Sequence, residues 1–417
     1  MTGPQRRRVV ITGMGAITPI GNTVEEFWQS CLEGRSGIDR LHKFNADAYP
    51  ARVAGEVKDF NPEDYMERRD ARRMARFSQF AVAAARQAIE SANLRLDQED
   101  RERIGIVLGV GIGGFPNVDE GMRTIMTRGG MRLDPFFFPK MLPNMAAGHI
   151  AMTFGIKGYT NTVTTACAAS TQAIGDALEL IRSGRADVVI AGGSEAALCE
   201  LGLAGFAVMR ALSTHIDPPQ KASRPFDAKR DGFVAAEGAA IFVLESLEHA
   251  LARGAPVLCE LGGYAATNDA FHIVAPCADG DGAARCMRLA LKDANIAPEE
   301  VDYINAHGTS TPLNDVTETI AIKKVFGELA YRIPISSTKS MIGHCFGAAG
   351  AVESVACVKT IETGWIHPTI NYEFPDPECD LDYVPNKARQ ADVRVILKNS
   401  FGFGGQNACL VFKQFEG

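Results

Sequence analysis

Cys167 is the first residue whose type and position could support catalysis. It follows a run rich in β-branched residues, 160–165, and precedes the apolar residues Ile174, Leu178 and Ile181 at helical spacing. This pattern predicts a strand, a turn at the cysteine and then a buried helix. Free backbone N–H groups and the positive end of the helix dipole at that point favour a thiolate, which is the reactive form of cysteine. The alternative is a small cysteine that only packs in the core.

Two histidines lie in glycine-rich loops after expected strands, far along the chain from Cys167. His307 lies in NAHGTSTPLND, and His344 follows Lys339 in TKSMIGHCFGAAG. A cysteine with one histidine suits hydrolysis or simple acyl transfer, with the imidazole as base. A second histidine would let the site stabilise a negative charge away from the cysteine, such as an enolate oxygen on a second substrate. Taken singly, each histidine could also be a surface or core residue.

The glycine-rich tail NSFGFGGQNACLVF could supply backbone donors. Gly402, Gly404 and Gly405 permit a close backbone approach and unusual dihedral angles. One N–H from this segment, with that of Cys167, could form an oxyanion hole. The alternative is a simple turn before the last strand.

The elements that would position these residues occur twice along the chain. ALKDANI and VDYINAHG resemble ARQAIESANL and IGIVLGVG, the His344 segment resembles the Cys167 segment, and CLVFKQF resembles AAIFVLESL. This similarity predicts a duplicated α/β unit, with residues 1–250 carrying the cysteine and residues 251–417 carrying both histidines. Parallel-leaning sheets covered by helices are expected, with the site at the carboxyl ends of strands. Near the start, Thr23 and Glu26 predict a capping box for a helix that ends at Leu32.

Three further segments could contact a partner protein, a second subunit or a dinucleotide. Residues 64–76 are rich in arginine and predict a helical face that is either solvated or docks an acidic partner. Phe136 to Phe138 predict a core or subunit-contact element, because three exposed aromatic residues would promote aggregation. Gly109, Gly111 and Gly114 fit a dinucleotide-binding pattern, but Pro116 interrupts the helix that this pattern requires, so no dinucleotide is expected.

Composition limits the remaining functions. The 417 residues carry a net charge of -7, which argues against nucleic acid as a partner. Ten cysteines without a CxxC pair indicate free thiols in a reducing cytoplasm rather than disulfides or a zinc site. A run of about 18 apolar residues is lacking, so no membrane span is expected.

Together these motifs resemble the β-ketoacyl-[acyl-carrier-protein] synthases, and most nearly the synthase II elongation type. The resemblance covers essentially the whole chain. It is carried by RRVVITGMGAITPIG, TTACAAS, SRPFDAKRDGFV, NAHGTSTPLND, SSTKSMIGHCFGAAGAVES and NSFGFGGQNA. It implies a thiolase-like α/β fold of two related halves in five αβαβα layers, a homodimer, and catalysis without a cofactor or metal.

The resemblance also implies roles for the residues singled out above. Cys167 would take an acyl group from acyl-carrier protein, and the N–H groups of Cys167 and Phe401 would hold the oxyanion. His307 and His344 would assist decarboxylation of malonyl-acyl-carrier protein and stabilise the enolate. The enolate would attack the acyl-enzyme, giving carbon dioxide and a β-ketoacyl-carrier protein two carbons longer.

Supporting roles follow from the same resemblance. Lys339 would position the histidines, with Glu318 as its ion-pair partner, and Phe401 would act as a gate over the acyl pocket. The implied substrate-binding residues are Thr309, Thr311, Ile112, Phe403 and Phe137, the last reaching in from a partner subunit. The implied docking residues for the acidic carrier protein are Arg69, Arg72, Arg73 and Arg210. A monovalent cation near Asn305, Glu353 and Asn399 is possible by the same analogy, but no metal is predicted.

The chain departs from the family pattern at Cys345, Ile342, Gln406, Val274 and Ala275. These departures put the substrate range in doubt more than the reaction. Cys345 invites comparison with thiolases, whose second cysteine is a base, but adjacent residues do not face the same way, so a packing role is expected. A ketosynthase of a polyketide or unusual-lipid pathway stays open. A non-catalytic chain-length subunit is disfavoured by Cys167 and both histidines.

Overall fold

The strands form two sets that share one topology. The structure is a computed structural model that describes residues 6–417. In the first set the spatial order is β1-β7-β6-β4-β5, and in the second it is β8-β14-β13-β9-β10. The first set comprises β1 (Val9–Ile17), β4 (Ile104–Gly109), β5 (Thr160–Val163), β6 (Val188–Glu195) and β7 (Gly238–Ser246). The second comprises β8 (Cys259–Asn268), β9 (Tyr303–Asn305), β10 (Ile335–Ser336), β13 (Val395–Gly402) and β14 (Gln406–Lys413).

Strand directions repeat as well. In each set, two antiparallel pairings are followed by two parallel ones, so β7 and β14 correspond, as do β4 and β9. The sets join through β1 and β8, which pair antiparallel at only two positions, Val10 with Glu260 and Ile11 with Cys259. The duplication read from the sequence therefore has a counterpart in the topology, while the division at residue 250 stays a prediction.

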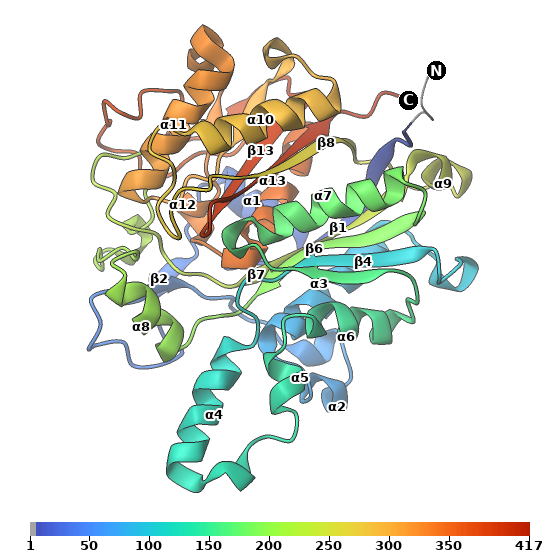
Figure 1. Ribbon diagram of the computed structural model, residues 1–417, viewed down its shortest axis with the longest axis vertical. Helices are drawn as coiled ribbons and strands as arrows, with labels where there is room; N and C mark the ends of the chain where they lie inside the picture. Colours follow the sequence, from blue (N-terminus) through green and yellow to red (C-terminus); the bar gives the residue numbers. More distant parts are fainter. Residues whose placement is uncertain (1–5) are drawn as a thin grey trace.

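Helices lie on both faces of the strands and between the two sets (Figure 1). α3 covers the outer face of the first set, α10 and α11 cover that of the second, and α7 and α13 pack between them. The helices of the layers are α3 (Arg76–Ser91), α6 (Met145–Phe154), α7 (Ala169–Arg182), α10 (Asp281–Ala294), α11 (Pro312–Phe326) and α13 (Ala349–Thr363). The remaining helices are α1 (Val24–Leu32), α2 (Arg68–Ala71), α4 (Phe115–Arg128), α5 (Phe137–Met141), α8 (Glu200–Val208), α9 (Leu247–Ala252) and α12 (Lys339–Ile342). Two short pairs, β2 (Ile38–Arg40) with β3 (Val53–Gly55) and β11 (Trp365–Ile366) with β12 (Arg389–Gln390), lie outside the main sheet.

Three apolar cores hold these layers together. The central core contains Ile174 and Leu178 of α7 beside Val352 and Val355 of α13. A second core lies between α3 and the first strand set, and a third between α10, α11 and the second strand set. α7 and α13 are buried on most sides, because strands cover them above and below.

The predicted α1 and its N-cap Thr23 are confirmed, but the reciprocal bond of the capping box is not formed. Thr23 accepts a hydrogen bond from the Glu26 N–H at 3.2 Å, and the Glu26 carboxylate accepts one from the Asn22 N–H at 2.9 Å. The carboxylate thus reaches one residue before the N-cap.

The prediction of one helical face across residues 64–76 is wrong. α2 is only one turn long, and Ala75, in an extended conformation, separates it from α3. The cause is local packing, since Met74 and Ala75 are buried and the chain turns there. Arg68, Arg69, Arg72 and Arg73 are exposed nonetheless.

Phe136 and Phe138 are not core residues of this chain. Their exposed fractions are 37% and 66%, so of the two expected settings only a subunit contact stays open. They belong to a projecting segment formed by α4 and α5 (Figure 1).

Candidate active site

Cys167 lies in a tight turn between β5 and α7. Ala166, just before it, has a φ of 50°, and the helix proper begins at Ala169. Two glycines let other strands approach this turn closely. A Cβ on Gly109 would lie 2.2 Å from the Ser170 nitrogen, and a Cβ on Gly402 would lie 3.1 Å from the Cys167 nitrogen. The ends of β4 and β13 therefore hold the start of α7.

The expectation that the helix start favours a thiolate is wrong for the resting protein. Burial raises the pKa of Cys167 to about 12, and the nearby Lys339 ammonium only partly opposes this effect. The cost of desolvating a charge thus exceeds the stabilisation by Lys339 and by the Phe403 N–H. Cys167 rests as a thiol, and its reaction needs a group that accepts the proton.

The backbone N–H of Phe403, rather than that of Phe401, lowers the pKa of the Cys167 thiol, although burial outweighs this effect. Phe401 lies two residues earlier, inside β13, where it pairs with Asn407 of β14. Gly404 and Gly405, with φ of 79° and 70°, form a turn directly after Phe403. The Phe403 N–H is therefore a further candidate for the oxyanion donor, and the role of the Phe401 N–H stays a prediction.

His307 follows β9 in a loop held by Glu318. The Glu318 carboxylate of α11 accepts hydrogen bonds from the backbone N–H groups of His307 and Gly308, each at 2.8 Å, and a third from the Asn399 side chain at 3.2 Å. Both carboxylate oxygens are therefore occupied by the loop backbone. Glu318 thus fixes the backbone of His307, whereas the imidazole ring contacts Lys339.

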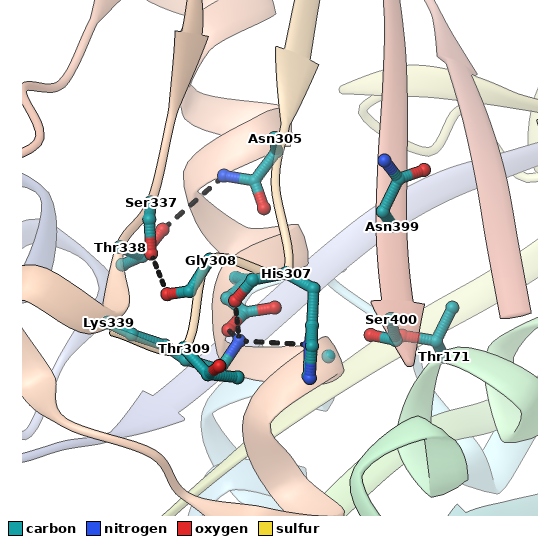
Figure 2. Close-up of polar contacts among 12 residues, drawn as sticks. Thr171, Asn305, His307, Gly308, Thr309, Ser337, Thr338, Lys339, Asn399 and Ser400 are labelled. Atoms are coloured by element: carbon teal, nitrogen blue, oxygen red, sulfur yellow. Dashed lines mark hydrogen bonds and ion pairs between the residues drawn. The ribbon is translucent and has the colours of Figure 1, made fainter. Parts of the chain in front are cut away.

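Lys339 pairs with Glu353 of α13 rather than with Glu318. The Lys339 ammonium lies 2.6 Å from the backbone oxygen of His307 and 3.3 Å from its Nδ1 (Figure 2). The predicted ion pair is wrong because Glu318 lies across the loop and binds its N–H groups. The prediction that Lys339 positions a histidine is consistent with these contacts.

Both histidines are neutral. Burial lowers the pKa of His307 and of His344 well below the usual range, and the ammonium of Lys339 lowers both further. Since an ammonium has no lone pair, Nδ1 of His307 must accept from Lys339, so its proton sits on Nε2. His307 is thus held as a hydrogen-bond donor at Nε2.

His344 faces His307 across the site. Their ring centroids are 5.6 Å apart, and His344 also stacks on Phe346 at 5.5 Å. Its backbone N–H donates to the Val234 oxygen at 2.7 Å. Cys345 is buried, with its thiol directed to the Glu237 oxygen at 3.5 Å, so it packs in the core as expected.

One cavity of about 480 Å³ joins these groups. Cys167, His307 and His344 line it, and so do the following predicted residues: Thr309, Thr311, Ile112, Phe401, Phe403, Glu318 and Arg210. Thr309 and Thr311 share a hydrogen bond of 2.8 Å between their hydroxyls. Phe206, Met209 and Phe346 add apolar wall, so the space suits an extended apolar chain with polar groups at one end.

Five predicted residues do not line this cavity. Lys339 contacts His307 from outside it. Phe137 lies against Gly121 of α4, where an added Cβ would come within 2.7 Å of its ring. Arg69, Arg72 and Arg73 are exposed around α2, and Arg73 lies over the Phe136 ring at 5.4 Å. Of the predicted docking residues, only Arg210 lines the cavity.

Sequence reasoning missed Glu195 at the end of β6. Its buried carboxylate accepts hydrogen bonds from the backbone N–H groups of Gly111, Ile112, Gly113 and Gly347, at 2.8 to 3.2 Å. Burial raises its pKa to about 7 despite these donors. The sequence signal for Glu195 is an acidic residue at the end of a strand, in AGGSEA. Acidic residues are also common where an ordinary strand passes into a loop, so this signal did not single it out.

The residues considered for a monovalent cation do not fit one. Glu353 faces the ammonium groups of Lys339 and Lys398, while the Asn399 side chain points to Glu318 on the other side of β13. Within residues 6–417 there is also no group of three or more His, Cys, Asp or Glu side chains placed to hold a metal.

Comparison with known proteins identifies the family of the chain. The model of the β-ketoacyl synthase N-terminal domain matches residues 6–250, and that of the C-terminal domain matches residues 258–373. A 3-oxoacyl-[acyl-carrier-protein] synthase 2 from Synechocystis sp. is 51% identical over 416 residues, 100% of both chains. One from Staphylococcus aureus is 47% identical over 412 residues, 99% of both.

Solved structures give the same result. A type II polyketide ketosynthase in complex with its acyl-carrier protein superposes with a TM-score of 0.92 at 40% identity, covering 99% of this chain and 100% of that one. A β-ketoacyl synthase from Burkholderia phymatum gives 0.91 at 37% identity, covering 98% and 100%. With its cysteine, its two histidines and its duplicated thiolase-like fold, the chain belongs to the β-ketoacyl synthase family.

Proposed function

We propose that this enzyme extends an acyl chain by decarboxylating condensation with malonyl-acyl-carrier protein. The observation that carries the proposal is that the Cys167 thiol and two neutral histidines, 5.6 Å apart, open into one largely apolar cavity. A nucleophile that holds the acyl group and two groups that serve a second substrate are what a condensation requires.

In the first half-reaction Cys167 attacks the thioester carbonyl of an acyl-carrier protein. The Sγ–C bond forms, the pantetheine thiol leaves, and the cysteine proton passes to it by way of a histidine. The N–H of Phe403, directed at the thiol, and that of Cys167 at the helix start stabilise the oxyanion.

In the second half-reaction malonyl-acyl-carrier protein loses carbon dioxide. His307, with its proton on Nε2, donates a hydrogen bond to the thioester oxygen as it becomes an enolate oxygen, and His344 acts from the facing side. The enolate carbon attacks the acyl-cysteine carbonyl, Sγ leaves, and the product is a β-ketoacyl-carrier protein two carbons longer. The threonine pair Thr309 and Thr311 at the cavity wall would bind the pantetheine amides.

Fatty acid elongation is favoured over a polyketide pathway. Two curated fatty-acid-type synthases are 51% and 47% identical to the chain, against 40% for the polyketide ketosynthase structure. The high structural similarity to that polyketide enzyme keeps a specialised pathway as the second candidate. Rates measured with saturated acyl-carrier proteins of increasing length, compared with polyketide-type starters, separate the two.

Carrier protein and a second copy of the chain are the proposed partners. The exposed arginines Arg69, Arg72 and Arg73 and, at the cavity, Arg210 would dock the acidic carrier protein. A homodimer is supported by β5, an edge strand of the main sheet, and by the exposed apolar residues of α4 and α5 beside it. Phe137 would then act in the partner's acyl pocket.

No helix in residues 6–417 is long and apolar enough to cross a membrane, and a cytoplasmic location stays part of this proposal.

Intact mass spectrometry tests the reaction. Wild-type protein incubated with acyl-carrier protein should gain one acyl mass, and Cys167→Ala should gain none. Adding malonyl-acyl-carrier protein should remove the acyl mass and yield the extended product. His307→Ala should still acylate but decarboxylate malonyl-carrier protein about a hundredfold more slowly, because a donor to the developing oxyanion is lost. His344→Ala should decarboxylate more slowly as well, and it should also acylate more slowly, because the histidine that can accept the cysteine proton is removed. Absence of an acyl mass on wild-type protein would overturn the proposal.

A further inference from the structure

Lys398 is a buried lysine that the proposed reaction does not use. It lies in the middle of β13 with no exposed surface, and its ammonium is 2.9 Å from Oε2 of Glu353. It also donates to the backbone oxygen of Asn399 at 2.8 Å and to the Thr171 hydroxyl at 3.2 Å, and it contacts the Ser400 hydroxyl. A fully buried ammonium is rare, so its partners must explain it.

Glu353 is shared between two lysines. Lys339 binds one carboxylate oxygen and Lys398 faces the other, so three buried charged groups leave one net positive charge beside His307. Within this cluster no second carboxylate balances that charge. The cluster is therefore a fixed positive centre next to the point where the enolate charge develops.

Strand geometry explains why Lys398 reaches Glu353. Lys398 pairs with Asn305 of β9 in register, and side chains of paired residues point to the same face of a sheet. That face is turned towards α7 and α13, which carry Thr171 and Glu353. The neighbouring Asn399 points to the opposite face, towards Glu318 of α11. Asn305, Glu353 and Asn399 therefore cannot converge on one ion, and of the three side chains only that of Glu353 contacts the ammonium of Lys398.

We propose that Lys398 is a covalently attached substitute for a bound monovalent cation, and that it makes the site independent of K⁺ and Na⁺. The ammonium holds Glu353 in place, Glu353 holds Lys339, and Lys339 fixes the tautomer of His307. Lys398 is thus a positioning residue, because it acts on substrate only through this series of contacts and through its charge.

The inference predicts how ions affect stability and catalysis. Melting temperature and the rate of malonyl-carrier-protein decarboxylation are measured in KCl, NaCl and choline chloride at equal ionic strength. Wild-type protein should show the same values in all three salts. Lys398→Ser should melt several degrees lower in choline chloride and decarboxylate about tenfold more slowly, as when a supporting contact of an active site is removed. KCl or NaCl should restore both values, because an ion can then bind Glu353 in the space left by the side chain.

Two variants serve as controls. Lys398→Met keeps the side-chain volume without the charge, so it should be impaired in every salt and not rescued by an ion. Lys387→Ser removes an exposed lysine with no side-chain partner in the described residues and should match wild type. If Lys398→Ser does not fold, two measurements still test the inference. They are the impairment of Lys398→Met in every salt and the insensitivity of wild-type protein to the choice of cation.

Three results would overturn the inference. Wild-type protein could lose stability or activity in choline chloride, Lys398→Ser could equal wild type there, or neither ion could rescue Lys398→Ser. The catalytic half of the inference rests on the proposed function, but the melting temperatures do not. If wild-type protein fails to decarboxylate malonyl-carrier protein, the proposed function is contradicted. The melting temperatures in the three salts then still test the role of Lys398.

Discussion

At the scale of single residues, the site combines a cysteine thiol that ionises with difficulty and two neutral imidazoles. The pKa of Cys167 is raised to about 12, so very little thiolate exists at neutral pH, and the N–H of Phe403 becomes important as a donor to sulfur and to the oxyanion that forms beside it. The same burial keeps His307 and His344 uncharged. Of the two, His344 has a ring nitrogen free to accept the cysteine proton, because Nδ1 of His307 accepts from Lys339 and its Nε2 carries a proton.

Replacing Gly402 by alanine should impair acylation. An added Cβ would lie 2.8 Å from the Thr165 oxygen and 3.1 Å from the Cys167 nitrogen, both of them backbone atoms. The tail must then move away from the cysteine and take the Phe403 N–H with it. We expect Gly402→Ala to acylate about a hundredfold more slowly, as when one oxyanion donor is lost, measured as the rise of the acyl mass.

The matched control is Gly205→Ala in α8, where an added Cβ meets no atom within 4 Å. It should acylate at the wild-type rate. An unchanged rate in Gly402→Ala would show that the tail does not supply the donor.

At the scale of elements, a buried carboxylate holds the loop after the second strand of each set. Glu318 binds the backbone of His307 and Gly308 after β9, and Glu195 binds that of Gly111 to Gly113 after β4. Glu195 also binds Gly347, near the start of α13. The loop that carries Ile112 to the acyl cavity is thus linked to the segment after His344. Rigid loops of this kind pre-organise a site.

Glu195 should make stability depend on pH. Its pKa is 4.5 when exposed and about 7 in the folded protein, so the folded state binds more protons between these values. Its contribution to the free energy of unfolding therefore falls as pH rises from about 4.5 to 7. Relative to wild type, Glu195→Gln should gain about 2 kcal/mol between pH 5 and pH 8, measured by urea unfolding.

Glu248→Gln, which changes an exposed carboxylate, is the control and should follow the wild-type pH dependence. A Glu195→Gln protein that keeps the same difference from wild type at both pH values would mean that the four N–H donors hold Glu195 ionised throughout.

At the scale of the whole molecule, exposed apolar residues concentrate on the projecting segment of α4 and α5. Met126 and Met131 are 81% and 98% exposed in the single chain, and β5 is an edge strand of the main sheet. Such a surface is characteristic of a subunit contact. If the homodimer uses it, the contact surface belongs to the first half of the fold, whereas the catalytic cavity is lined by residues of both halves.

The double substitution Met126→Asp and Met131→Asp should convert a dimer into a monomer, because burying two carboxylates in an apolar contact is costly. Sedimentation velocity at micromolar concentration measures the change. Leu251→Asp on α9, which is 59% exposed, should leave the dimer intact. A monomeric wild-type protein would contradict the homodimer.

Sequence patterns predicted much of this molecule, and particular residues show where they stopped. Strands and helices were predictable from periodicity, and the duplication followed from similarity between segments, as with β4 and β9. Cys167 and the histidines were identified by their loops. The partner of Lys339 could not be identified, because Glu353 and Glu318 are at similar sequence distances and only the packing of α13 decides between them. The pKa of the Cys167 thiol could not be predicted either, because it depends on burial by the packed fold and no local sequence pattern shows that burial.

The single cavity shared by Cys167, His307 and His344 has a kinetic consequence. The acyl thioester and the malonyl thioester must reach their reactive groups through the same space. The first carrier protein therefore has to dissociate before malonyl-carrier protein can bind. The enzyme should therefore follow ping-pong kinetics, with parallel double-reciprocal plots. Excess malonyl-carrier protein should also compete with the acyl donor for the unacylated enzyme, so each substrate becomes an inhibitor of the other's half-reaction.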